Sequence, residues 1–367
     1  MTKRYTPKIL INYLVKEFSF SLLIFFGIFL SLILLSTYIE EIIFFKEKDI
    51  DGNFFLKIFV ITLIKTPTVL LNLSPFVFLF SGIFFFVKLL RNSEITPLSL
   101  SGFSNLFITM VPAFYSFLLG IILVFVLSPI SSELSRYYES IKQKYSSNEN
   151  LIIMSNTGLW VKEKKNNETF IIRANQVRDQ NFTNLENVTI YKFNKHNNFS
   201  ERIDGKKVDI NGTQWNFKNA SRISKEETVN LKRYKYSSEI NLNQLKNFFN
   251  NSNVFSIWNI LDELKQIRQR GYFGQELVIM FNKYLSLPFL LFSMITLSTL
   301  FTLRINLNFN NFIYIFFGVL AGIVVHFLGD LSMALGKSGK IPLVLSVWIP
   351  VIIIMSLSMF SLLREDE

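Results

Sequence analysis

The sequence predicts an α-helical integral membrane protein with six transmembrane helices and an inserted all-β domain outside the cytoplasm. Half of the 367 residues are hydrophobic and 40 are Phe, but only 18% are charged. Soluble domains carry about 25% charged residues, so much of this surface does not face water. Three long apolar runs precede a polar block from about Ser131 to Gly271, and three follow it. We therefore expect three helices in 1–130, the β domain in 131–253, a linker helix in 254–271 and three helices in 272–367.

Each apolar run is long enough to cross a bilayer, which takes about 20 helical residues. The first run follows a basic start but is too long for a signal peptide, and no small-residue cleavage site follows it, so we expect it to be retained. Pro67 and Pro75 predict a kink in the second, and Ser128-Pro129 is expected to end the third. The predicted spans are 19–39, 54–87, 106–127, 273–303, 309–335 and 341–363.

The positions of basic residues predict the orientation, because short cytoplasmic loops are enriched in Lys and Arg. The N-terminus, the Lys88/Arg91 loop, Arg304 and Arg364 fall on one side of a six-span arrangement. The polar block falls on the other side, together with Lys337 and Lys340, which oppose the rule. We expect both termini in the cytoplasm and the block outside it. The formal charge of +11 fits these signals and anionic lipid, and no nucleic-acid recognition motif is present.

Within the polar block, two segments alternate apolar and polar residues, TGLWVKEKKNNETFIIRANQV and NVTIYKFNKHNN. This period of two predicts antiparallel strands in a small sandwich. Turns are expected at Asn166-Asn167, Asp204-Gly205 and Asn211-Gly212. Val254–Arg270 instead has helical periodicity, and Gly271 is expected to end that helix.

No catalytic or metal-binding residue is predicted. Cys is absent, and the two His residues cannot form a metal site by themselves. The segment ALGKSGK at 334–340 lacks the first glycine of a phosphate-binding loop, since position 331 is Leu. His326 and Asp330 lie four residues apart, hence on one face of the fifth span. They form either a structural polar pair or a functional intramembrane site.

Four lysines are candidates for contact with an anionic lipid head group. Lys65 and Lys283 lie in the outward halves of their spans, where an ammonium either reaches the interface or pairs with a head group. Lys46 and Lys48, in the first outer loop, are expected at the same level.

The loop RNSEITPLSLSGFS after the second span predicts a short amphipathic helix. Ser93 is the expected N-cap, Glu94 favours the positive end of the helix, and Gly102 suits its C-terminal cap. Pro97 is tolerated only in the first turn, so the helix is expected to start near Thr96. The apolar side chains Ile95, Leu98 and Leu100 then need a partner, either the membrane surface or a cytoplasmic protein.

The motif S-E-I-x₆-G-x-S in this loop resembles that of the lipopolysaccharide export permeases LptF and LptG. Further similar stretches are TGLWVKEKKNNETFIIRANQV, SIWNILDELKQIRQRG and ELVIMFNKYLSLP, and the resemblance covers essentially the whole chain. Gly158-Leu159-Trp160 and the linker spacing look closer to the LptG half. Thr37 and Thr68 depart from the family, in which basic residues are frequent at these positions.

The resemblance implies a β-jellyroll domain in the periplasm and a sister permease with which the chain forms a heterodimer. It also implies a cytoplasmic ABC ATPase dimer that uses ATP, so this chain is expected to bind no cofactor. The helix from Ser93 to Gly102 would be the coupling helix that docks on the ATPase. Lipopolysaccharide would leave the outer leaflet of the inner membrane and pass to a periplasmic bridge protein, and Lys283 would be the best lipid contact.

Two other functions remain open at this stage. One is a membrane-anchored sensor or assembly scaffold whose outer β domain binds a ligand. The other is a secondary transporter in which His326 and Asp330 relay protons.

Overall fold

The computed structural model describes residues 8–46, 48, 52–145, 151–155, 158–165, 168–177, 184–195, 198–211, 213–224, 227–238, 255–269, 274–303 and 311–364. Asn166, Asn167, Gly212, Gly271 and Arg304, which entered the predictions above, lie outside these ranges. The chain divides into a helical unit (1–140, 253–258 and 278–367) and a β unit (141–252 and 259–277).

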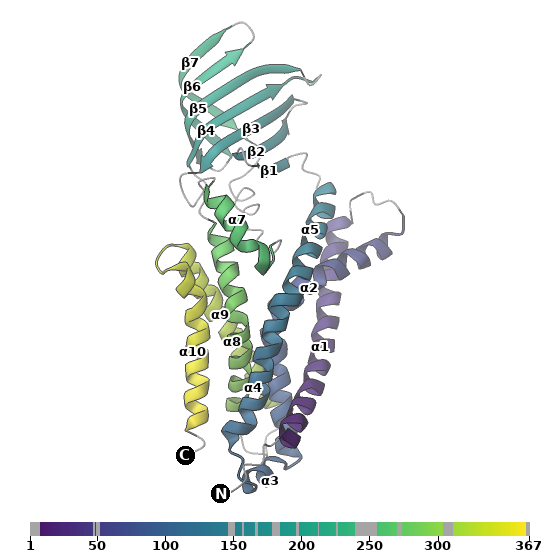
Figure 1. The fold of residues 1–367 in the computed structure, drawn as a ribbon. Coiled ribbons are helices and arrows are strands. Elements are labelled where there is room, and N and C mark those ends of the chain that lie inside the picture. Colours follow the sequence, from purple (N-terminus) through teal and green to yellow (C-terminus); the bar gives the residue numbers. More distant parts are fainter. Residues whose placement is uncertain are drawn as a thin grey trace. The chain divides into compact units, whose positions relative to one another are not determined.

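Helices account for nearly all of the helical unit (Figure 1). Together with the linker helix α7, they are α1 (Lys8–Phe45), α2 (Phe54–Arg91), α3 (Ile95–Leu100), α4 (Asn105–Ile122), α5 (Ser128–Lys144), α7 (Ile257–Gln269), α8 (Gln275–Leu303), α9 (Asn311–Lys337) and α10 (Leu343–Leu363). In the described part of the chain, six helical stretches are long and apolar enough to cross a membrane: Lys8–Phe45, Phe54–Arg91, Asn105–Lys142, Gln275–Thr302, Phe316–Lys337 and Leu343–Phe360. The predicted number of spans is confirmed.

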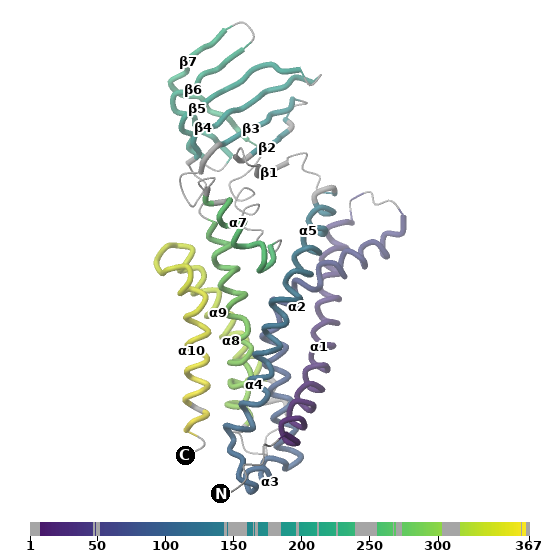
Figure 2. The backbone as a smooth tube through the Cα atoms, viewed as in Figure 1, coloured from purple at the N-terminus to yellow at the C-terminus, as the bar shows by residue number. Residues whose placement is uncertain are grey.

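The start of α1, the short helix α3 and the end of α10 lie at one end of the helical unit (Figure 2). A chain that crosses the membrane an even number of times begins and ends on the same side. Helices α2 and α8 are the most buried spans. In their most apolar 18-residue segments, 61% and 56% of the residues are buried inside the protein, compared with 17% in α1 and in α9. The large exposed apolar faces of α1 and α9 suit a lipid or protein environment better than water.

The third span is longer than predicted, because Ser128-Pro129 does not end it. A π-helical turn, η1 (Leu123–Leu127), joins α4 directly to α5, and the Ser128 N–H donates to the Leu123 carbonyl five residues earlier. Proline has no N–H for the α-helical ladder and crowds the preceding turn. The wider π turn is a common way to accommodate such a break. The sequence from Ser131 to Lys144, predicted to belong to the β domain, is therefore helical.

Helices approach closely where a glycine faces another helix. A Cβ added to Gly120 of α4 would lie 2.7 Å from the Cα of Pro288 in α8, so only glycine fits there. Gly318 and Gly322 of α9 lie against the side chains of Ile83 and Phe76 of α2, which can move aside more easily than backbone. Small residues at helix contacts are typical of membrane bundles, in which association depends on close packing.

The β unit contains one antiparallel sheet with strands in sequential order, β1 to β7 (Figure 1). The strands are β1 (Leu151–Ser155), β2 (Gly158–Lys165), β3 (Glu168–Val177), β4 (Asn184–Phe193), β5 (Phe199–Asn211), β6 (Gln214–Ser224) and β7 (Thr228–Ser237). An inserted β domain is thus confirmed. The expected sandwich differs from what the described strands form, since they make a single meander and not two facing sheets.

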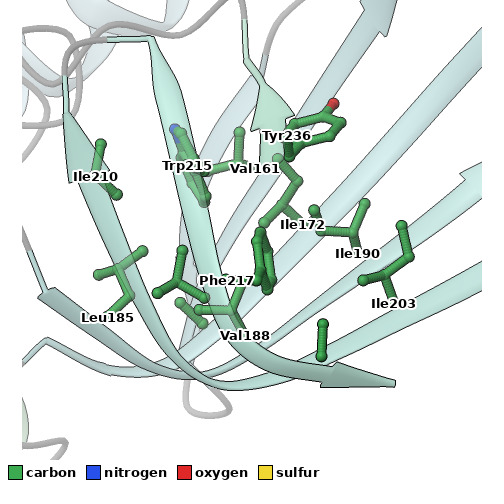
Figure 3. Close-up of a cluster of buried hydrophobic side chains, with 13 residues drawn as sticks. Val161, Ile172, Leu185, Val188, Ile190, Ile203, Ile210, Trp215, Phe217 and Tyr236 are labelled. Atoms are coloured by element: carbon green, nitrogen blue, oxygen red, sulfur yellow. The ribbon is translucent and has the colours of Figure 1, made fainter. Parts of the chain in front are cut away.

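One face of this sheet carries the hydrophobic core of the β unit. Trp215 and Phe217 of β6 lie among aliphatic side chains from the neighbouring strands (Figure 3), and both are almost fully buried. Asp204-Gly205 was predicted as a turn, but β5 runs straight through it. Gly205 points to the core opposite the ring of Phe217, where a Cβ would collide, so the glycine makes room for an aromatic ring and does not bend the chain.

The linker helix α7 lies within the predicted 254–271. Its first N–H, from Ile257, donates to the Ser128 hydroxyl at 3.3 Å, and the Trp258 ring lies 5.3 Å from that of Phe125. Both contacts attach the start of α7 to the π turn at the junction of α4 and α5.

Candidate functional site

The short helix α3 is held rigidly at its beginning by the end of α2. Ser93 has a φ of 55°, the N–H of Ser93 donates to Leu90 and that of Glu94 to Leu89, each at 3.0 Å. This is a Schellman motif that ends α2, with Ser93 in the left-handed position. The predicted role of Ser93 as N-cap of α3 is therefore wrong. Glu94 is the residue before α3, which begins at Ile95, one residue earlier than expected.

A second Schellman motif ends α3. Gly102 has a φ of 86°, its N–H donates to Ser99 at 3.0 Å, and the Phe103 N–H donates to Leu98 at 3.2 Å. The Ser104 hydroxyl then caps α4 by accepting from the Phe107 N–H at 3.1 Å. Backbone hydrogen bonds thus form a tight turn at each end of this six-residue helix, and they restrict its movement relative to α2 and α4.

Glu94 connects α3 to the first span. Its carboxylate accepts a hydrogen bond of 2.5 Å from the Tyr13 hydroxyl of α1 and one of 2.9 Å from the Asn92 amide. Tyr13 lies 81 positions away in the sequence. No local pattern could have indicated this partner.

The described residues of the chain cover the apolar side chains of α3 only in part. No residue of α3 is buried, Ile95 and Leu98 are half-buried, and Leu100 is 85% exposed. Pro97 lies in the first turn of the helix, as its lack of an N–H requires. Within the described residues, α3 thus exposes the apolar side chain of Leu100, six positions after the Glu94 carboxylate.

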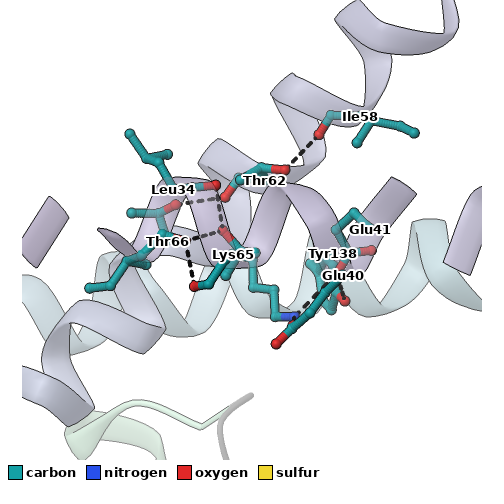
Figure 4. A network of polar contacts seen from close by, with 11 residues as sticks. Leu34, Glu40, Glu41, Ile58, Thr62, Lys65, Thr66 and Tyr138 are labelled. Atoms are coloured by element: carbon teal, nitrogen blue, oxygen red, sulfur yellow. Dashed lines mark hydrogen bonds and ion pairs between the residues drawn. The ribbon is translucent and has the colours of Figure 1, made fainter. Parts of the chain in front are cut away.

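A polar network near the far end of α1 contains Lys65, one of the predicted lipid contacts (Figure 4). The Lys65 ammonium lies 2.8 Å from Glu40 and 3.1 Å from Glu41. The Tyr138 hydroxyl of α5 donates to Glu41 at 2.7 Å, and Lys65 lies over the Tyr138 ring at 5.6 Å. The network joins α1, α2 and α5, and Glu41 is fully buried within it. Lys65 is therefore occupied by two carboxylates of its own chain.

Thr37 and Thr68, named above as departures from the resemblance, both form hydrogen bonds within the helical unit. The Thr37 hydroxyl donates to the Ile33 carbonyl of its own helix at 2.6 Å. Thr68 contacts the Ser135 hydroxyl of α5 at 2.7 Å.

The other three predicted lipid contacts lie in different surroundings. Lys46 is exposed just after α1, and the Lys48 ammonium lies 3.2 Å from the centre of the Phe44 ring. Lys283 is an exposed residue of α8, next to Asn282, whose side-chain oxygen accepts from Trp348 at 3.1 Å.

His326 and Asp330 do form a pair, with 2.9 Å between Nδ1 and the carboxylate. The side chains are 54% and 60% exposed on α9, and the His326 ring lies 5.9 Å from that of Phe76. The two polar groups thus satisfy one another.

These features define a class of protein: a polytopic membrane protein with a β domain between its third and fourth spans and a short rigid helix between its second and third. The chain belongs to the family of the lipopolysaccharide export system permease LptF/LptG, which it matches over residues 12–364. It is a multi-pass inner-membrane protein and a permease component for lipopolysaccharide export. The match does not distinguish the LptF half from the LptG half. No curated protein matches the chain.

Proposed function

We propose that this chain is the permease subunit of an ABC-type exporter that extracts lipopolysaccharide from the outer leaflet of the inner membrane. In this proposal it pairs with a sister permease, and a separate cytoplasmic ATPase dimer uses the ATP. The chain itself hydrolyses nothing and binds no cofactor. Gly158-Leu159-Trp160 and the spacing of the linker helix favour the LptG half.

The observation that carries the proposal is the geometry of α3. Its two fixed ends allow a force on α3 to reach α2 and α4, and the Tyr13–Glu94 hydrogen bond extends the connection to α1. Its exposed Leu100 supplies apolar surface for a protein partner. A helix with these properties suits a contact that transmits motion from an ATPase.

An external energy source is physically required for this transport. Removing acyl chains from a bilayer costs about 0.8 kcal/mol per CH₂, so a lipid with several chains does not leave without work. The chain therefore needs a partner that supplies free energy.

The proposed orientation follows from the basic residues. Lys88 and Arg91 at the end of α2 and Arg364 after α10 favour a cytoplasmic location for the end that contains α3. The β domain is then periplasmic and delivers lipid to a bridge protein. Lys46 and Lys283, which are exposed, are the stronger candidates for head-group contacts, whereas we assign Lys65 to the network with Glu40 and Glu41.

The first test is purification from mild detergent of the wild type and the variant Glu94→Lys. The wild type is expected to retain an ABC ATPase, a sister permease and a phosphorylated glycolipid. Glu94→Lys removes the acceptor for Tyr13 and reverses the charge beside the docking surface, so ATPase recovery and export should fall at least about tenfold. Lipid should still co-purify.

Glu94→Gln is the matched control, because an amide oxygen still accepts from Tyr13. It should retain most of the ATPase association. Normal ATPase association and export in Glu94→Lys would contradict the coupling role of α3. Recovery of the wild-type chain alone, with ordinary phospholipid, would favour a sensor or scaffold.

A further inference from the structure

The face of the β sheet opposite the hydrophobic core contains a cavity of about 760 Å³. Strands β3 to β7 supply its walls, and none of the residues discussed above as coupling or lipid contacts lines it. Its size falls in the range of small-molecule sites, about 300–1,000 Å³.

The cavity lies along a line where the side-chain alternation of four strands shifts together. In β5, for example, Gly205 and Val208 both face the core, so Lys206 and Lys207 both point outward. The same spacing occurs in β4, β6 and β7, where it places Asn187, Asn219 and Lys232 beside Lys206. Asn187 and Asn219 have φ of 51° and 57°, which Asn tolerates better than most residues. This shared irregularity puts an additional polar residue of each strand on the outer face.

The lining of the cavity is strongly cationic. It contains Arg173, Arg202, Lys206 and Lys232, and a single carboxylate, Asp204. Asp204 is already occupied, since it accepts from Arg202 at 2.9 Å and from Thr189 at 2.7 Å. The hydrogen bond with Asp204 raises the pKa of Arg202 further above an already high value. Lys206 and Lys232 have no carboxylate partner among the described residues.

A cationic cavity suits an anionic ligand, and the uncharged residues of the lining indicate which other chemical groups that ligand would carry. Asn187, Asn219 and Asn230 offer amide donors and acceptors, which suit hydroxyl groups. Aromatic residues are missing from the residues that line the cavity, so it has no platform on which nucleic-acid bases could stack. Val188, Gly205, Ala220 and Leu231 also line the cavity.

We propose that this cavity is a binding site for a phosphorylated saccharide. Lys206, Lys232 and the guanidinium of Arg202 contact the phosphate, and the three amides contact sugar hydroxyls. The proposal rests on the proposed export function in one respect: the saccharide would be part of the head group of the exported lipid.

The test is calorimetric titration of the full chain in detergent with three soluble probes: trehalose 6-phosphate, trehalose and inorganic phosphate. We expect trehalose 6-phosphate to bind at least about tenfold more tightly than either of the other two, since only it engages both kinds of side chain. The double variant Lys206→Gln/Lys232→Gln should lose at least about tenfold in that affinity.

The matched control is Lys207→Gln/Arg233→Gln, which removes the same charge one residue further along the same two strands, outside the cavity lining. It should bind like the wild type. Equal losses in both double variants would mean unspecific attraction to a basic surface and would overturn the proposal. So would equal binding of phosphate alone, equal binding of trehalose, or no binding of trehalose 6-phosphate.

The probes contain no lipid and the titration contains no ATPase. A chain that co-purifies with the ATPase but ignores the probes would leave the export function standing without this site. A chain that binds the probes but recovers no ATPase would support this site and contradict the export function.

Discussion

Lys65 shows how a residue that looks like a ligand contact becomes part of the protein's own structure. Its ammonium satisfies two carboxylates from α1, and Tyr138 supplies a hydrogen bond to one of them. Glu41 is fully buried, and an ionised carboxylate is costly in that position unless it is paired. The ion pair itself adds little to the stability of the protein. Its disruption costs more, because it would leave the buried Glu41 charge without a partner.

We predict that Lys65→Met destabilises the protein by about 1–3 kcal/mol, because it leaves the buried Glu41 charge uncompensated. The effect stays below that of a fully buried pair because Lys65 is 23% exposed. Adding Glu41→Gln removes this charge and should restore part of the stability. Thermal unfolding in detergent measures both effects.

Lys57→Met serves as the control, since Lys57 is an exposed residue of the same helix. It should change stability by less than about 0.5 kcal/mol. If Glu41→Gln makes the Lys65→Met protein still less stable, the two residues do not form the proposed pair.

At the scale of elements, close contacts between helices depend on small residues. Gly120 places α4 against the backbone of α8 at Pro288, and a methyl group has no space there. Because the obstacle is backbone, it cannot move aside as a flexible side chain would.

We predict that Gly120→Ala lowers the stability by about 1–3 kcal/mol through overpacking. Gly27→Ala is the matched control, because the position lies within α1 and an added Cβ meets nothing within 4 Å. Alanine favours a helix over glycine by about 1 kcal/mol, so the control should be neutral or stabilising. Unfolding temperatures that fall equally in both variants would contradict the packing argument.

Helix α3 illustrates a different point at the same scale. The loop contains a Ser–Glu–Ile start that reads as an N-cap, but the serine belongs to the end of the preceding helix. Both functions use a residue that leaves the helical conformation, so a local pattern cannot separate them. The decisive difference is the pair of hydrogen bonds back to Leu89 and Leu90.

At the scale of the whole molecule, the question is where the energy for transport enters. Energy would enter at the His326–Asp330 pair in a proton-driven transporter, and it would enter at α3 in the ATPase-driven exporter that we propose. The pair is complete within α9 itself. A pair four residues apart on one helix contributes only about 0.2–0.5 kcal/mol.

We predict that His326→Leu/Asp330→Leu reduces lipid export only a few-fold and leaves ATPase association unchanged. A moderate loss is expected because the packing around Phe76 changes. Export by reconstituted vesicles that contain the complex measures the effect. Complete loss of export, with the ATPase still bound and active, would instead favour a proton relay.

Much of the architecture follows directly from the sequence. The six spans come from the length of the apolar runs, because a helix that satisfies its own backbone is the form in which these segments can cross lipid. The β domain follows from the period of two in segments such as GLWVKEKK and NVTIYKF. The pairing of His326 with Asp330 follows from their spacing of four on one helix. All of these depend on residues that are neighbours along the chain.

Only the tertiary structure decided the partners of Glu94 and Lys65, the continuation of the third span and the position of Gly205 within a strand. Tyr13 and Glu94 are separated by 81 positions, and Lys65 meets Glu40 across 25. The π turn before Pro129 and the ring of Phe217 beside Gly205 likewise depend on how helices and strands pack. Hydropathy and local periodicity specify which segments form and which face they bury. The contacts that connect those segments arise from packing in three dimensions, which no local pattern encodes.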